Sequence, residues 1–133
     1  HPLRLRADSL KLIQSSKPLI MPVTSLFESF SSLAPSFKIL DYGLSIQINQ
    51  YRFSKKYCIL PNPLVLGYAL AAISSGQAKR LLLAGFDGYS GDDPLKAEND
   101  MIFKMHQETD SAVPLLAVTP TLYNIESTSI YAL

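Results

Sequence analysis

The sequence predicts an α/β protein, a three-layer Rossmann-like domain whose mostly parallel sheet has about five strands and carries helices on both faces. Short apolar runs, such as "YCIL" at 57–60 and "LLLAGF" at 81–86, alternate with segments of helical periodicity. The run at 81–86 also lacks a polar face, which is typical of a parallel strand buried on both sides. We therefore expect residues 81–86 to form a central strand.

Composition limits the number of domains and the kinds of partner. The chain has 133 residues, of which 47% are hydrophobic, so it can build one core, and we expect a single domain over residues 1–133. Its 12 basic and 11 acidic residues nearly cancel, and no basic run exceeds two residues, which argues against a nucleic-acid partner. No apolar run reaches the roughly 18 residues of a membrane span, and the N-terminus has no signal-peptide core. These features favour a cytoplasmic protein, and the initial His in place of Met indicates a fragment.

The single cysteine, Cys58, lies in the predicted strand "YCIL". One thiol can make neither an internal disulfide nor a cysteine-rich metal site. Because free cysteines are among the most buried residues, we predict a small buried side chain rather than a nucleophile. We expect no metal and no cofactor in this domain.

The N-terminal segment predicts a helix, a strand and a second helix. An apolar stripe suggests a first helix that ends at 15–18, and "PLIMPVTS" has the length of a buried strand. Ser25 and Glu28 form a capping-box pattern, which predicts a helix over about 26–33. The hydroxyls of Thr24 and Ser25 would face the carboxyl edge of the sheet and could donate to a ligand, although capping alone accounts for Ser25.

Residues 37–60 predict two or three short strands, of which 57–60 is the clearest. In "PNP" at 61–63, Asn is a strong N-cap and Pro suits the first helical position, so we predict a helix that begins at Asn62 and ends at Gly76. A strand, a helix and a strand in this order predict that 57–60 and 81–86 form a parallel pair.

The C-terminal part predicts one helix and two strands. Asp92 and Asp93 before Pro94 should open a helix that runs to about Gln107. On that helix, we interpret His106 as a half-buried side chain rather than a catalytic base. The runs "LLAV" at 115–118 and "TSIYAL" at 128–133 suggest further strands, the second at an edge.

Polar residues follow several of the predicted strands. Asp87 comes directly after the predicted strand at 81–86. Its carboxylate could accept hydrogen bonds from ribose or sugar hydroxyls, or it could hold a metal through water. Alternatively, Asp87 could simply form the turn. The carboxyl ends of parallel strands meet at one edge of a sheet, where free N–H groups of a helix start favour anions. We therefore predict a site for a nucleotide, a nucleotide sugar or another phosphorylated ligand, made by seven residues: Thr24, Ser25, Asn62, Asp87, Tyr89, Thr119 and Thr121.

Sequence signatures of common enzymes are missing. The chain has no Gly-x-Gly-x-x-Gly, no Gly-x-x-x-x-Gly-Lys-Ser/Thr, no His-Glu-x-x-His and no Gly-x-Ser-x-Gly pattern. The usual dinucleotide and triphosphate cradles are therefore absent from the sequence. No catalytic residue can be assigned.

The stretch "LPNPLVLGYALAAISSGQAKRLLLAGFDGYSGDDPLKAENDMIF", with "AVTPTLYNIESTSIY" after it, resembles the Rossmann-like C-terminal domain of bacterial multidomain aldolases. In these proteins the domain follows a barrel similar to 4-hydroxy-2-oxovalerate aldolase. "AGFDGY" is also distantly similar to bacterial sialyltransferases and to pterin-diphosphokinase-like Rossmann domains. The resemblance implies a ligand around Asn62, Asp87 and Tyr89, with Thr119 and Thr121 on the rim.

Two functions follow from this resemblance. The first is an accessory ligand-binding domain of an aldolase that acts on keto acids or sugar acids, with the lyase chemistry and any divalent metal in an N-terminal barrel. The alternative is a sialyltransferase-like glycosyltransferase that uses a nucleotide-sugar donor. The alternative implies a catalytic His in a lid, whereas this chain has only His1 and His106.

Overall fold

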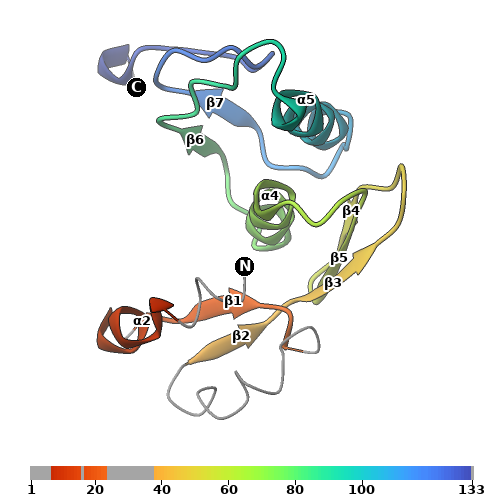
Figure 1. Cartoon of the computed structure of the whole chain (residues 1–133), viewed down its shortest axis with the longest axis vertical. Helices are drawn as coiled ribbons and strands as arrows, with labels where there is room; N and C mark the ends of the chain where they lie inside the picture. Colours follow the sequence, from red (N-terminus) through yellow and green to blue (C-terminus); the bar gives the residue numbers. More distant parts are fainter. Residues whose placement is uncertain (1–6, 16, 24–37, 133) are drawn as a thin grey trace. The chain divides into compact units, whose positions relative to one another are not determined.

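The computed structural model describes residues 7–15, 17–23 and 38–132 (Figure 1). The chain forms two compact units, residues 1–44 and residues 45–133. The predicted helix at 26–33 lies outside the described residues.

The first unit contains a short helix, α2 (Ser9–Ser15), and a parallel pair of strands, β1 (Leu19–Met21) and β2 (Ile39–Asp41). A carboxylate oxygen of Asp41 accepts a hydrogen bond from the backbone N–H of Val23 at 3.0 Å, next to the end of β1. The helix ends before Lys17–Pro18, and a strand follows at once. The sequence prediction is thus confirmed for both elements.

A mixed three-stranded sheet opens the second unit, although the first two residues of β3 belong to the first unit. The sheet consists of β3 (Gly43–Ile46), β4 (Arg52–Phe53) and β5 (Tyr57–Leu60). β5 lies in the middle, and β4 pairs with it in the antiparallel direction. Both edges of β5 are therefore occupied.

Helix α4 (Val65–Ser75) starts later than the sequence suggests. The N-cap is Leu64, which makes no side-chain cap, so the prediction of an N-cap at Asn62 was wrong. Leu64 and Leu66 pack against the core cluster, and their burial rather than a capping side chain accounts for the start. Gly76 caps the other end as predicted, but with φ of −74°; the left-handed residue is Gln77, at φ of 57°.

The remaining elements form a strand–helix–strand unit. β6 (Leu81–Leu83) and β7 (Leu115–Ala117) pair in parallel, and α5 (Pro94–Gln107) connects them. The carboxylate of Asp93 accepts from the backbone N–H of Leu95 at 2.9 Å, which confirms the predicted helix start.

After β7, residues 118–132 form no regular strand. Ser127 makes an isolated parallel bridge with Ala117, and Ile130–Ala132 form the 3-10 helix η3. The expected edge strand at 128–133 is therefore wrong for the residues that the structure describes.

The predicted three-layer Rossmann-like sheet of about five parallel strands was also wrong. The described strands form two parallel pairs and one mixed sheet. β5 cannot pair with β6, because β3 and β4 occupy both of its edges. β6 is three residues long and has one described neighbour, so it is not central, and 39% of Leu82 is exposed.

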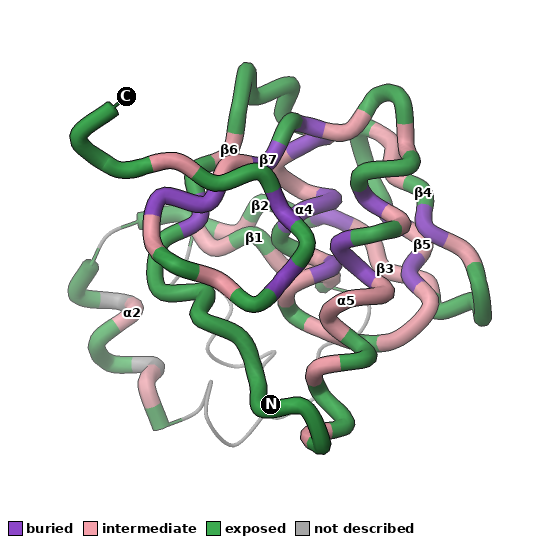
Figure 2. The backbone as a smooth tube through the Cα atoms, turned by 90° about the horizontal axis from the view of Figure 1, so that it is seen from above, coloured by how far each residue is buried: buried purple, intermediate pink, exposed green. Residues whose placement is uncertain are grey.

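The core of the second unit lies between α4, α5 and the β6–β7 pair. Figure 2 shows buried positions along α4, α5 and β7. One cluster collects Leu70, Leu83, Ile102, Phe103, Val113, Leu115, Ala117, Tyr123 and Ile125. Among the described residues, no helix has the length and apolar character needed to cross a membrane.

Candidate functional site

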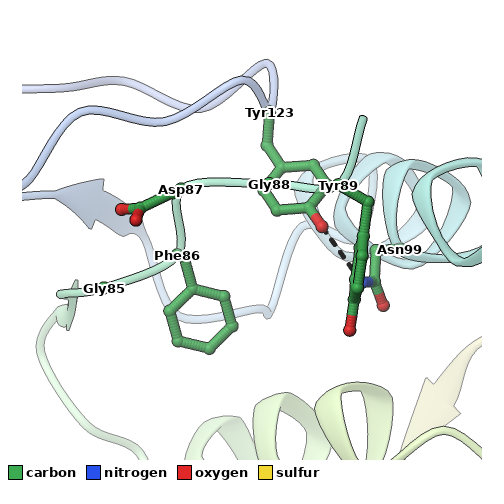
Figure 3. A pocket seen from close by; sticks show the side chains of 7 residues that line it. All are labelled: Gly85, Phe86, Asp87, Gly88, Tyr89, Asn99 and Tyr123. Atoms are coloured by element: carbon green, nitrogen blue, oxygen red, sulfur yellow. Dashed lines mark hydrogen bonds between the residues drawn. The ribbon is translucent and has the colours of Figure 1, made fainter. Parts of the chain in front are cut away.

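A pocket of about 340 Å³ lies at the carboxyl end of β6. We call it the β6 pocket. Its walls come from the loop after β6, from α5 and from the loop after β7 (Figure 3). The lining residues are Gly85, Phe86, Asp87, Gly88, Tyr89, Asn99 and Tyr123.

Two glycines shape the loop after β6. Gly85 and Gly88 have φ of +73° and +103°, values that side chains rarely allow. A Cβ on Gly88 would also lie 2.9 Å from Cβ of Leu122, so the loop after β7 leaves no room for a side chain. Gly88 thus allows close packing between the two loops, whereas Gly85 is needed only for its backbone conformation, since a Cβ there would meet nothing within 4 Å.

Hydrogen bonds hold these two loops together. The backbone N–H of Gly85 donates to Oγ1 of Thr119 at 2.9 Å. The backbone N–H of Leu122 donates to the carbonyl oxygen of Asp87 at 2.9 Å. One wall of the pocket is therefore fixed by hydrogen bonds between residues that are far apart in the sequence.

The polar floor of the pocket is a pair of side chains. Nδ2 of Asn99, on α5, donates to the hydroxyl of Tyr123 at 3.1 Å. The ring of Tyr123 packs on the ring of Phe103, with centroids 4.9 Å apart. Phe86 contacts the ring of Phe103 edge-on, with centroids 6.3 Å apart. Packing against the core thus positions the Asn99–Tyr123 pair.

Asp87 and Tyr89, both predicted from sequence, line this pocket and are exposed. In Figure 3 the carboxylate of Asp87 points away from the Asn99–Tyr123 pair, while the ring of Tyr89 lies beside Asn99. The structure therefore brings Tyr89 to the polar floor and leaves Asp87 at the rim.

The other predicted residues lie elsewhere. Thr119 lines a second hollow of about 560 Å³ with residues 127–131, and Oγ1 of Thr121 accepts from the backbone N–H of Tyr123 at 3.2 Å. Asn62 lines neither of these two hollows, and its buried Oδ1 has no hydrogen-bond partner among the described residues. Thr24 and Ser25 lie outside the described residues. Ligand binding by any of them stays a prediction.

Sequence reasoning missed Asn99 and Tyr123. Asn99 stands five positions after Pro94, and thus in the first half of a helix that starts near the carboxyl end of β6. A polar side chain at that place in the helix could have indicated a residue of the binding pocket. Tyr123 gives no such signal, because its place depends on how the loop after β7 returns over α5.

Among the residues that the structure describes, the two groups best suited to proton transfer or nucleophilic attack, His106 and Cys58, lie in the interior. Nδ1 of His106 is 2.8 Å from the hydroxyl of Tyr51, and Nε2 is 2.8 Å from the carbonyl oxygen of Val113. Burial lowers the pKa of His106, which is fully buried rather than half-buried as expected. Burial also raises the pKa of Cys58 to about 11, and the predicted buried thiol is confirmed. Neither residue lines the β6 pocket.

Among the described residues, no group of three or more His, Cys, Asp and Glu side chains could hold a metal ion. We compared the chain with protein-family models, with curated proteins and with solved structures, and none of the three comparisons gave a significant match.

Proposed function

We propose that the second unit binds a small ligand with a sugar or nucleoside ring, such as a nucleotide sugar, in the β6 pocket. One observation carries this proposal: the exposed ring of Tyr89 lies in one pocket with the amide of Asn99, whose partner is the hydroxyl of Tyr123. Aromatic faces stack on bases and on the apolar faces of sugars, and an amide offers both a donor and an acceptor. Such a combination fits ligands that pair a flat face with polar edges.

The proposal is for binding rather than for chemistry on the ligand. A general base must lie within hydrogen-bond reach of the proton that it takes. His106 and Cys58 are buried away from the pocket lining, and both nitrogens of His106 already have partners. Two ideas remain predictions from the resemblance: that this domain is an accessory domain of an aldolase with a barrel, and that it is a glycosyltransferase.

Thermal unfolding of the full chain with nucleosides, nucleotides, nucleotide sugars and monosaccharides tests the proposal. A ligand at about 100 times its dissociation constant stabilises the folded state by roughly 2.7 kcal/mol. For a domain of this size, that corresponds to a rise in melting temperature on the order of 10 °C.

Tyr123→Phe removes the hydroxyl that accepts from Asn99 but keeps the ring, so this variant should lose most of the ligand-induced shift. Tyr131→Phe is the matched control, because Tyr131 is 96% exposed and lies outside the β6 pocket. A screen in which no compound shifts the melting temperature would contradict the proposal. Release of the sugar from a nucleotide sugar would support the glycosyltransferase alternative instead.

A further inference from the structure

Charge is distributed very unevenly along the chain. Residues 45–80 contain five basic and no acidic side chains, whereas residues 81–133 contain eight acidic and two basic ones. The net charge of +1 conceals this separation. The β6 pocket belongs entirely to the acidic segment.

Most of these acidic residues lie close in sequence to residues that line the pocket, and Asp87 itself lines it. The stretch from Ala84 to Asp100 supplies the loop after β6 and the first half of α5, and it contains five carboxylates and one lysine. That lysine, Lys96, pairs with Asp100, with Nζ 2.7 Å from Oδ2, so the stretch keeps a net charge of −4 (five carboxylates minus one lysine). The five carboxylates belong to Asp87, Asp92, Asp93, Glu98 and Asp100.

The start of α5 is also occupied. The N-terminus of a helix attracts anions, because its first N–H groups are free and its dipole is positive there. Here Asp93 supplies the anion, since its carboxylate accepts from the N–H of Leu95 at 2.9 Å. A phosphate would therefore have to displace the Asp93 carboxylate from the start of α5, and that carboxylate is part of the same chain.

Four of the five basic side chains of residues 45–80 lie at the opposite end of β6. Lys79 and Arg80 directly precede the strand, so they mark its amino end, whereas the pocket lies at its carboxyl end. Lys55 and Lys56 lie in the turn that follows Ser54. Oγ of Ser75, in the last turn of α4, donates to the carbonyl oxygen of Ser54 at 2.6 Å. This turn therefore lies near the end of α4 that leads into the amino end of β6. The second lysine of residues 81–133, Lys104, lies in the last turn of α5, and its Nζ is 3.8 Å from Oε1 of Glu108.

We infer that the β6 pocket selects an uncharged sugar or nucleoside over the phosphate ester of the same molecule. This inference rests on the proposed function and names its ligand class. The ring of Tyr89 and the Asn99 amide would bind the ring of either ligand, whereas the carboxylates of residues 84–100 would repel only the phosphate. If a nucleotide sugar binds, its uncharged ring occupies the pocket and its phosphates remain outside.

Matched ligand pairs test this inference by calorimetric titration of the full chain. Uridine is compared with uridine monophosphate, and glucose with glucose 1-phosphate, at low salt and at about 0.3 M salt. We expect the phosphate ester to bind at least about threefold more weakly at low salt and the difference to shrink at high salt, because exposed charges are screened.

Variants locate the source of the repulsion. Asp92→Asn combined with Glu98→Gln removes two exposed charges near the pocket and should improve binding of the phosphate ester at least about twofold, with little effect on the uncharged partner. Asp110→Asn is the matched control, because Asp110 lies beyond the far end of α5, a helix about 20 Å long. The control should leave both affinities unchanged.

The outcomes separate the two proposals. Tighter binding of the uncharged partner, with the salt and variant effects above, supports the inference. Equal or tighter binding of the phosphate ester overturns it but leaves the proposed function in place. Failure of both pairs, together with a flat ligand screen, overturns the proposed function and the inference with it.

Discussion

The hydroxyl of Tyr51 lies 2.8 Å from Nδ1 of His106, although 55 positions separate the two residues. Their rings meet edge-on, with centroids 5.8 Å apart. A carbonyl can only accept, so the contact of Nε2 with the carbonyl oxygen of Val113 places the proton of the neutral ring on Nε2. Nδ1 is then the acceptor, and the hydroxyl of Tyr51 donates to it. His106 thereby links the segment before β4 to α5 and to the segment before β7.

Tyr51→Phe should lower the free energy of unfolding by about 1 to 3 kcal/mol, because it leaves Nδ1 of His106 buried without a donor. Urea denaturation followed by circular dichroism measures the change. Tyr57→Phe is the matched control, since Tyr57 is 51% exposed, and it should stay within about 0.5 kcal/mol of the wild type. Equal effects in the two variants would show that the buried hydrogen bond contributes no stability.

Stability should depend on pH through His106. Burial lowers the pKa of the folded-state imidazole below its ordinary value of 6.5, so the unfolded chain takes up a proton at a higher pH than the folded chain does. Stability contributed by the neutral ring is therefore present above pH 6.5 and is lost as the pH falls below it. Denaturation midpoints between pH 7.5 and about 5.5 test this, in a range where carboxylates change little. His106→Gln should flatten the profile, and an equally steep profile in that variant would assign the effect to another group.

Cys58 should react slowly with thiol reagents in the native protein. It is 0% exposed, and burial raises its pKa to about 11, so almost no reactive thiolate is present at neutral pH. Labelling by a chromogenic disulfide reagent should become rapid only in denaturant. Cys58→Ala should keep ligand binding in the β6 pocket, and rapid labelling of the native protein would show that the strand around Cys58 opens readily.

Gly88→Ala should destabilise the fold by more than 1 kcal/mol, since the new methyl group meets Leu122 and the backbone has φ of +103°. The same change should abolish the ligand-induced rise in melting temperature, because the two loops that wall the pocket would separate. Gly91→Ala is the control: a Cβ there meets nothing within 4 Å, so the free energy of unfolding should change by at most about 0.5 kcal/mol. Thermal melts of both variants, with and without ligand, check the prediction.

Local features of the sequence predicted local structure well. The cap at Asp93, the strand at 57–60 and the burial of Cys58 are each as expected, because capping and short apolar runs depend on neighbouring residues. The cap at Asn62 failed for a different reason. The helix there starts where leucines reach the core, and that position depends on distant contacts.

The sequence by itself determined a mixture of helices and strands, several of their positions and a polar loop after the strand that begins at Leu81, although that strand ends at Leu83 rather than at Phe86. Only the tertiary structure decided which strands pair, and it placed β3 and β4 on the two edges of β5. Strand pairing and loop packing depend on residues far apart in the chain, whose meeting no local pattern encodes. For the same reason the sequence indicated Asp87 and Tyr89, whereas the pair of Asn99 and Tyr123 that completes the pocket emerged only from the fold.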